Sequence, residues 1–117
     1  MFAAHHGLEN LVAIVDDNGL QIDGACTEVM CLGHIAQKFM AFGWRALEVD
    51  GHDVIAIHEA LEKAKWRSGS PTVIVAATVK GKGVSFMEGQ AGWHGKAPSA
   101  DECERALAEL AAAEGSE

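Results

Sequence analysis

Two polar segments contain the residues best suited to chemistry. The first, LVAIVDDNGLQIDG at positions 11–24, runs from apolar residues into Asp16, Asp17 and Asn18, so a buried strand is followed by a polar turn. In an open α/β sheet, ligands bind outside the carboxyl ends of the strands. The segment therefore predicts one wall of a binding site, although Asn18-Gly19 alone is also an ordinary turn dipeptide.

The second segment, TVKGKGVSFMEGQAGWHGKA at 78–97, is rich in glycine and has no sustained hydrophobic period. A loop of this length inside a compact domain is functional or disordered. Lys80 and Lys82 lie on a backbone that glycine allows to approach an anion, as phosphate binding requires, although solvated Lys-Gly loops are equally common. His94 could donate to phosphate or move protons near neutral pH.

The elements that must position these residues form an α/β pattern. Apolar periodicity predicts a partial open parallel sheet of order β-α-β-α-β with flanking helices. Connections of this kind are right-handed, so the carboxyl ends of the strands share one edge, and the loops at 16–23, 50–53 and 80–94 should converge there. The predicted strands are 11–15, 44–49 and 72–77, and the predicted helices are 2–8, 27–43, 54–64 and 99–111.

Single residues define several helix ends. Asp53 is placed to cap the helix at 54–64, which makes 50–53 a turn and cap, and Ser99 with Glu102 forms a capping box. Gly33 weakens the first half of the helix at 27–43, and residues 112–117 should fray. The apolar faces expected to pack are Val54, Ile57, Leu61 and Ala64 in one helix and Leu107, Leu110 and Ala111 in the last.

The length, net charge and composition of the chain argue against several classes of protein. With 117 residues, one small domain is expected, and a formal charge of −8 argues against nucleic-acid or anionic-membrane partners. No apolar run approaches the roughly 18 residues of a membrane span, so a cytoplasmic protein is expected. Cys26, Cys31 and Cys103 have no metal-site spacing and are expected to be reduced thiols.

Four motifs occur in an order that resembles transketolases. They are LVAIVDDNGLQIDG, FGW with EVDGHD, PTVIVAATVKGKGVSFME and WHGKAP. From Phe2 to about Leu110, the chain resembles the N-terminal, thiamine-diphosphate-binding subunit of the split, two-chain form. The resemblance implies that residues 1–117 are a single partial domain, the downstream part of a thiamine-diphosphate-binding fold.

The resemblance also implies the cofactors thiamine diphosphate and Mg²⁺ and a role for five residues. Asn18, through its side-chain oxygen, and Leu20, through its carbonyl, would be Mg²⁺ ligands, in keeping with the preference of this ion for hard oxygen atoms. Ile22 would shape the cofactor pocket, and Lys80 would contact the cofactor. His94 would lie against the diphosphate, face the substrate and act as a catalytic residue.

The sequence departs from the family pattern at its start. Transketolases carry an upstream Gly-Asp-Gly segment whose aspartate is the charged Mg²⁺ ligand, and no Gly-Asp-Gly occurs here. The central strand and the pyrimidine-binding half, with the glutamate that activates the cofactor, are also expected to lie outside this sequence. We therefore expect an N-terminally incomplete domain with weak cofactor affinity, an exposed strand at 11–15 and no activity alone.

The expected partners are a C-terminal, pyrimidine-binding transketolase subunit, a second copy and sugar-phosphate substrates. Two other functions remain open. One is a segment of another thiamine-dependent enzyme such as a deoxyxylulose-phosphate synthase, against which the stretch from KGKG to WHGK argues. The other is a non-catalytic relic or interaction module that keeps the fold but binds no cofactor.

Overall fold

The computed structural model describes residues 1–114, and the chain divides into two compact units. Residues 1–17 and 32–78 form one, which we call the sheet unit; residues 18–31 and the described part of 79–117 form the other, the pocket unit. The single partial domain expected from the sequence stays a prediction. No helix among the described residues is long and apolar enough to cross a membrane.

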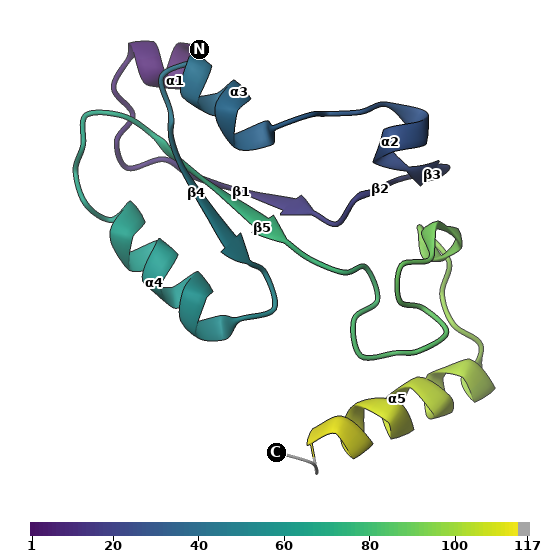
Figure 1. The fold of residues 1–117 in the computed structure, drawn as a ribbon. Coiled ribbons are helices and arrows are strands. Elements are labelled where there is room, and N and C mark those ends of the chain that lie inside the picture. Colours follow the sequence, from purple (N-terminus) through teal and green to yellow (C-terminus); the bar gives the residue numbers. More distant parts are fainter. Residues whose placement is uncertain (115–117) are drawn as a thin grey trace. The chain divides into compact units, whose positions relative to one another are not determined.

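The sheet unit contains three parallel strands in the order β1-β5-β4 (Figure 1). β5 is the central strand, and its residues Thr72 to Ala76 are buried. A continuous run of β-branched and small apolar residues suits a strand that is paired on both edges and covered on both faces. The elements of this unit are α1 (Phe2–His5), β1 (Val12–Asp17), α3 (Ile35–Ala41), β4 (Arg45–Asp50), α4 (Val54–Ala64) and β5 (Thr72–Ala77).

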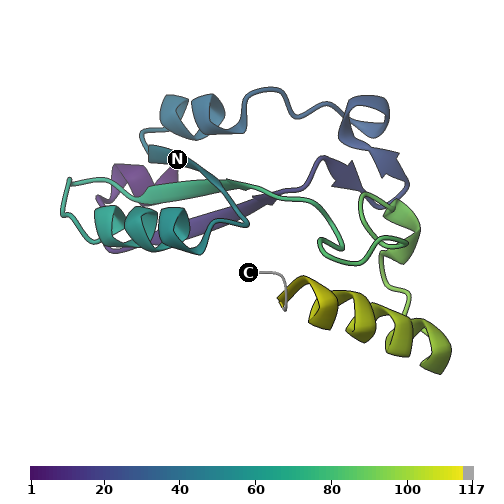
Figure 2. The ribbon, with the colours of Figure 1, turned by 60° about the horizontal axis from the view of Figure 1, so that its bottom comes forward.

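Helices α3 and α4 cover opposite faces of this sheet (Figures 1 and 2). Ala36 of α3 packs with Val73 and Val75 in the core of one face, and Ala60 and Ala64 are the buried residues of α4 on the other. Alternate residues of a strand point to opposite faces, so a fully apolar β5 can meet both helices. The predicted α/β fold class with a parallel sheet is confirmed.

The turn after β4 is built by two aspartates. The carboxylate of Asp50 accepts a hydrogen bond from the backbone N–H of His52 at 2.8 Å. The carboxylate of Asp53 accepts from the N–H groups of Ile55 and Ala56 at 2.9 and 3.0 Å, which satisfies two donors at the start of α4. The predicted turn and helix cap at 50–53 is confirmed.

The pocket unit combines a short hairpin with a long loop and a helix. Its elements are β2 (Leu20–Gln21), β3 (Gly24–Ala25), α2 (Cys26–Val29), the 3₁₀ turn η1 (Ala91–Trp93) and α5 (Ala100–Glu114). The Ser99 hydroxyl accepts from the N–H of Glu102 at 3.3 Å, and the Glu102 carboxylate accepts from the N–H of Ser99 at 2.8 Å. The predicted capping box is confirmed. The helix continues through Glu114, and the rest of the expected fraying lies outside the described residues.

Several predicted element boundaries are wrong, and the helix expected at 2–8 is the shorter α1 (Phe2–His5). The expected helix at 27–43 is two short helices, because α2 ends at Val29 and α3 begins at Ile35. Gly33 between them has a φ of +59°, which a continuous right-handed helix cannot include. Asp16 and Asp17 belong to β1 and not to the following turn.

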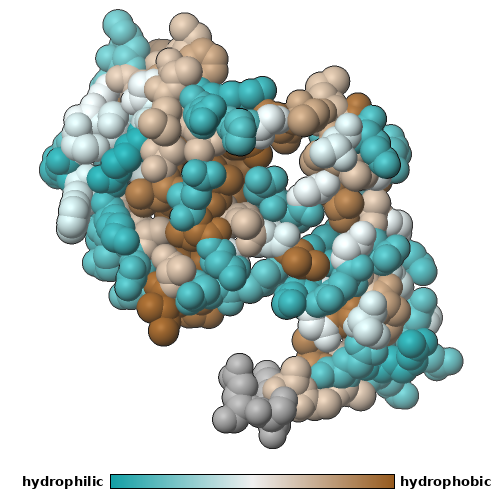
Figure 3. Space-filling view, in the orientation of Figure 1, coloured by the Kyte–Doolittle hydropathy of each residue, from teal (hydrophilic) through white to brown (hydrophobic). Residues whose placement is uncertain are grey.

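The predicted apolar faces of two helices are also only partly buried. Ala64 of the predicted stripe of α4 is buried, but Val54 is 78% exposed, and the other buried residue is Ala60, so the packed stripe overlaps the expected one only in part. Leu107 of α5 is 62% exposed. Figure 3 shows that apolar surface, drawn in brown, also gathers over the strands of the sheet unit.

Candidate functional site

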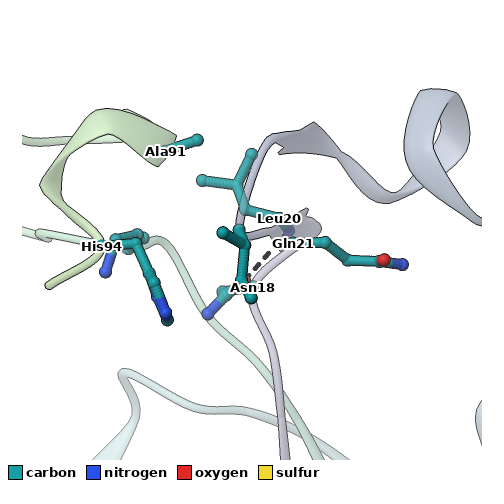
Figure 4. A pocket seen from close by; sticks show the side chains of 7 residues that line it. Asn18, Leu20, Gln21, Ala91 and His94 are labelled. Carbon is teal, nitrogen blue, oxygen red and sulfur yellow. Dashed lines mark hydrogen bonds between the residues drawn. The ribbon is translucent and has the colours of Figure 1, made fainter.

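A pocket of about 350 Å³ lies within the pocket unit. All five residues assigned to a site from the sequence line it (Figure 4). The chemical role of each residue stays a prediction, but the structure brings the five together in one cavity. Its lining residues are Asn18, Leu20, Gln21, Ile22, Lys80, Ala91 and His94.

Asn18 and Leu20 are held by a tight local turn. Gly19 has a φ of +71°, a conformation that glycine adopts without steric cost. The turn allows the side-chain oxygen of Asn18 to accept a hydrogen bond from the backbone N–H of Leu20 at 3.0 Å (Figure 4). The amide of Asn18 is thereby oriented by its own backbone before any ligand binds.

The hairpin geometry turns the backbone carbonyl of Leu20 to the side on which the Asn18 side chain lies. The N–H of Cys26 donates to the carbonyl of Gly19 at 2.9 Å, so Leu20 and Ala25 face each other as a non-hydrogen-bonded pair. The N–H and the C=O of Leu20 then both point away from β3, to the side of the Asn18 side chain, which already accepts the N–H. Two neutral oxygen atoms, Asn18 Oδ1 and Leu20 O, therefore lie on one side of the hairpin.

This pair of oxygen atoms fits part of a Mg²⁺ coordination shell. Mg²⁺ requires hard oxygen ligands and commonly takes several of them from substrate phosphates and water. No group of three His, Cys, Asp or Glu side chains within residues 1–114 is arranged to hold a metal ion.

Lys80 and His94 provide the cationic and hydrogen-bonding side of the pocket. Lys80 is half-buried, and His94 follows η1, where its backbone N–H donates to Ala91 at 2.9 Å. His94 and Asn18 are both among the side chains that line the pocket (Figure 4). An ammonium group and an imidazole beside amide and carbonyl groups form a set of groups suited to an anionic ligand.

An aromatic pair supports the segment that carries His94. The indole N–H of Trp93 donates to the carbonyl of Phe86 at 3.1 Å, and the two rings lie 5.7 Å apart between centroids. The ammonium of Lys96 lies 4.1 Å from the centroid of the Trp93 ring, in cation–π geometry. Trp93 is thus fixed at its ring edge and face, next to the histidine.

Sequence reasoning missed two residues that line the pocket, Gln21 and Ala91. Gln21 donates from its side-chain amide to the carbonyl of Met30 at 2.6 Å and points away from His94 in Figure 4. Ala91 carries no chemical signal that a sequence pattern could reveal. Residues 50–53, expected to join the other loops at one edge, belong to the sheet unit, and their convergence with those loops stays a prediction.

The comparison with protein families decides the assignment. Residues 1–114 match the family described as transketolase, thiamine diphosphate binding domain. The chain belongs to this family. The match extends over almost all of the sequence, so the predicted resemblance to a transketolase N-terminal, thiamine-diphosphate-binding part is confirmed.

Curated relatives of this transketolase-family chain include enzyme subunits. One subunit of the apulose-4-phosphate transketolase of Phocaeicola vulgatus is 40% identical over 94% of this chain and 39% of its own length. The 6-deoxy-6-sulfo-D-fructose transketolase subunit SqwG of Clostridium sp. is 40% identical over 94% of this chain and 40% of its own length. The chain thus spans about two-fifths of these relatives, whose names imply at least one further subunit.

Solved transketolases share the fold. The transketolase of Campylobacter jejuni matches with a TM-score of 0.84 and 32% identity, covering 94% of this chain and 17% of that one. A Pichia stipitis transketolase, solved in complex with sedoheptulose 7-phosphate, matches with a TM-score of 0.84 and 31% identity over 94% of this chain and 16% of its own. These likenesses support the α/β assignment.

Proposed function

We propose that this chain supplies the diphosphate-binding part of a transketolase, which moves a two-carbon ketol unit between sugar phosphates with thiamine diphosphate and Mg²⁺. The observation that carries the proposal is that all five predicted site residues line one pocket: Asn18, Leu20, Ile22, Lys80 and His94. Thiamine diphosphate, when bound, stabilises the carbanion that this chemistry needs, while the protein supplies position and electrostatics.

Each residue has a role that its chemistry permits. Asn18 Oδ1 and the Leu20 carbonyl would hold Mg²⁺, and Lys80 would neutralise charge on the diphosphate. His94 would donate a hydrogen bond to the diphosphate and face the substrate, where an imidazole can also transfer a proton near neutral pH. Ile22, which is 68% exposed, would form an apolar wall that a bound cofactor covers.

We also propose that the chain alone binds the cofactor weakly and is inactive. The two candidate Mg²⁺ ligands in its pocket are neutral, and a carboxylate ligand adds charge attraction that they lack. A pyrimidine-binding transketolase subunit and a second copy would complete the enzyme. The subunit names of the relatives support the proposed partner subunit.

The sugar substrate is proposed only as a class. Two relatives that are both 40% identical to this chain carry the names of different ketoses, one a phosphate and one a sulfo sugar. Equal identity to both does not select either sugar. The shared chemistry is a ketose that carries an anionic group, and a sugar phosphate is the member of that class that we propose.

A thermal melt tests the cofactor site. Ligand that binds only the folded state raises the midpoint, and at ten times its Kd it contributes about 1.4 kcal/mol. Thiamine diphosphate with Mg²⁺ at millimolar concentration should raise the midpoint of the wild type and of Asn10→Ala, a control at an exposed asparagine. Asn18→Ala should abolish the shift.

Two outcomes of these binding measurements would contradict the proposal. A cooperatively folded wild type without any shift would show that this pocket does not hold the cofactor in the isolated chain. Tight, Mg²⁺-dependent binding at submicromolar concentration would contradict the proposed weakness of two neutral ligands.

Reconstitution separates the proposed enzyme from the alternatives. The chain is combined with a pyrimidine-binding transketolase subunit and the upstream family segment, and consumption of xylulose 5-phosphate in the presence of ribose 5-phosphate is followed. Turnover that requires His94 supports the transketolase. Activity only with pyruvate and glyceraldehyde 3-phosphate would favour a deoxyxylulose-phosphate synthase, and no cofactor binding in the assembled sample would favour a relic.

A further inference from the structure

The loop from Lys80 to Gly89 is closed at its ends by the backbone. The N–H of Gly89 donates to the carbonyl of Lys80 at 2.9 Å, so the first and last residues of the loop are joined. Gly81 has a φ of +71°, and a Cβ atom there would lie 2.8 Å from backbone atoms of Met87. The two sides of the loop therefore touch at this point, immediately beside the lysine that lines the pocket.

Glu88 ties the interior of the same loop together. Its Oε1 accepts a hydrogen bond from the backbone N–H of Gly83 at 2.9 Å and lies 3.6 Å from the ammonium of Lys82. The side chain is about two-fifths exposed, so the ion pair alone contributes little, but the carboxylate also satisfies a backbone donor. One side chain thus spans the loop from its second half to its first.

Helix α5 holds the outer side of the loop. Glu109 accepts hydrogen bonds from the backbone N–H and the hydroxyl of Ser85 at 2.5 and 2.9 Å. These donors hold the pKa of the Glu109 carboxyl below its ordinary value of 4.5. Leu110 occupies the space where a side chain on Gly83 would lie, and Val84 is buried. The loop is therefore a braced structure with its lysine-bearing end at the pocket.

The two lysines of the KGKG sequence have different surroundings. Lys80 lines the pocket, whereas Lys82 is paired with Glu88 and does not line it. Within the described residues, Lys80 is the pocket's lysine, and its backbone position is defined by the bond to Gly89. A group that keeps the loop closed consequently determines where the Lys80 ammonium can reach.

We propose that Glu88 is a positioning residue: by bridging to the Gly83 N–H across the loop it maintains the backbone closure between Lys80 and Gly89, and so holds Lys80 where its ammonium meets the diphosphate group of the ligand. This inference rests on the function proposed above for the pocket. It assigns Lys80 the contact with the anion and Lys82 the pairing with Glu88.

A double-mutant cycle between Glu88 and Lys80 tests the proposal, with affinity for thiamine diphosphate and Mg²⁺ measured by calorimetry on the full chain. Glu88→Ala and Lys80→Gln should each lower the affinity about tenfold, and the double variant should be no weaker than Lys80→Gln alone. Glu88→Gln keeps an acceptor for the Gly83 N–H and should recover most of the affinity. Glu104→Gln, an exposed carboxylate on α5, is the matched control and should bind as the wild type does.

A second readout does not require cofactor binding. Amide hydrogen exchange should show the Gly89 N–H protected in the wild type and in Glu88→Gln, and exchanging at least tenfold faster in Glu88→Ala, while Ile74 in the central strand is unchanged. Additive losses in the cycle, or an unchanged Gly89 amide in Glu88→Ala, would overturn the positioning role. If the wild type binds no cofactor, the proposed function fails, and the exchange measurement alone decides whether Glu88 closes the loop.

Discussion

At the scale of single residues, Gly51 shows why the turn after β4 needs its sequence. A Cβ atom at this position would lie 2.3 Å from Thr78 Cγ2 and 3.0 Å from the carbonyl oxygen of Ala77. The backbone N–H of Gly51 donates to that carbonyl at 2.7 Å, and the hydroxyl of Thr78 is hydrogen-bonded to Asp16. The ends of β4, β5 and β1 are therefore connected through a contact that leaves no room for a side chain.

Gly51→Ala should destabilise the fold by about 1–3 kcal/mol, the usual cost of overpacking. Neither the carbonyl of Ala77 nor the hydrogen-bonded Thr78 can move without loss of a hydrogen bond. Gly92→Ala is the control, because Gly92 also has no positive φ and has nothing within 4 Å of its would-be Cβ. Denaturant unfolding measures both variants, and equal costs would contradict the steric argument.

At the scale of elements, α5 shows how a helix end depends on ionisation. The hydrogen bonds from Ser99 lower the pKa of Glu102 from its ordinary 4.5, and the ammonium of Lys96, 3.6 Å away, adds to this effect. A carboxyl group whose pKa is lower in the folded state stabilises that state when it is ionised. The capping box should therefore be complete above pH 4.5, the ordinary value of Glu102, and be lost as the pH falls through the lowered pKa.

The pH dependence of the Ser99 amide resonance measures this loss. The resonance should move with a midpoint below 4.5 as the Glu102 carboxylate is protonated and its hydrogen bond to the amide weakens. Glu102→Gln should remove the titration at Ser99, while Glu109→Gln should leave it in place. A midpoint at or above 4.5 would contradict the assigned direction of the shift.

At the scale of the whole molecule, the sheet unit exposes an apolar strand. β1 pairs with β5, and no described strand pairs with its other edge. α3 packs mainly on β4 and β5, and α4 mainly on β4. Val12 and Ile14 of β1 are consequently 36% and 61% exposed. An apolar strand with open backbone groups is a site for pairing with another chain, as the sequence led us to expect.

Ile14→Lys should reduce concentration-dependent self-association of the isolated chain, because a charge on an edge strand opposes pairing with a second strand. Leu107→Lys is matched in both substitution and exposure, since Leu107 is 62% exposed on α5 and Ile14 is 61% exposed. Sedimentation velocity across a range of concentrations measures the self-association of the wild type and of both variants. Equal effects of the two variants, or a wild type that stays monomeric throughout, would contradict the role of β1.

Local chemistry in the sequence was sufficient for several features. The strand at 72–77 has the predicted bounds, and the caps formed by Asp53 and by Ser99 with Glu102 are present. These features depend on residues within a few positions of one another, so the local sequence pattern is enough to predict them. The five site residues were named from motifs that resemble a family, and they line one pocket because their two segments meet in the pocket unit.

Tertiary structure alone decided the features that depend on distant neighbours. The stripe of α4 that packs is centred on Ala60 and Ala64, with Val54 exposed, because the sheet and not the helix determines which side is covered. The closure of the loop at 80–89 depends on side chains from within it and from α5, whose partners no periodicity reveals. The sequence by itself determined the three strands of the parallel sheet, the caps and the family, but not the β2–β3 hairpin. The tertiary structure decided which apolar faces are covered, since that depends on distant segments, and how Lys80 is held, since side-chain contacts within the loop and from α5 follow no sequence period.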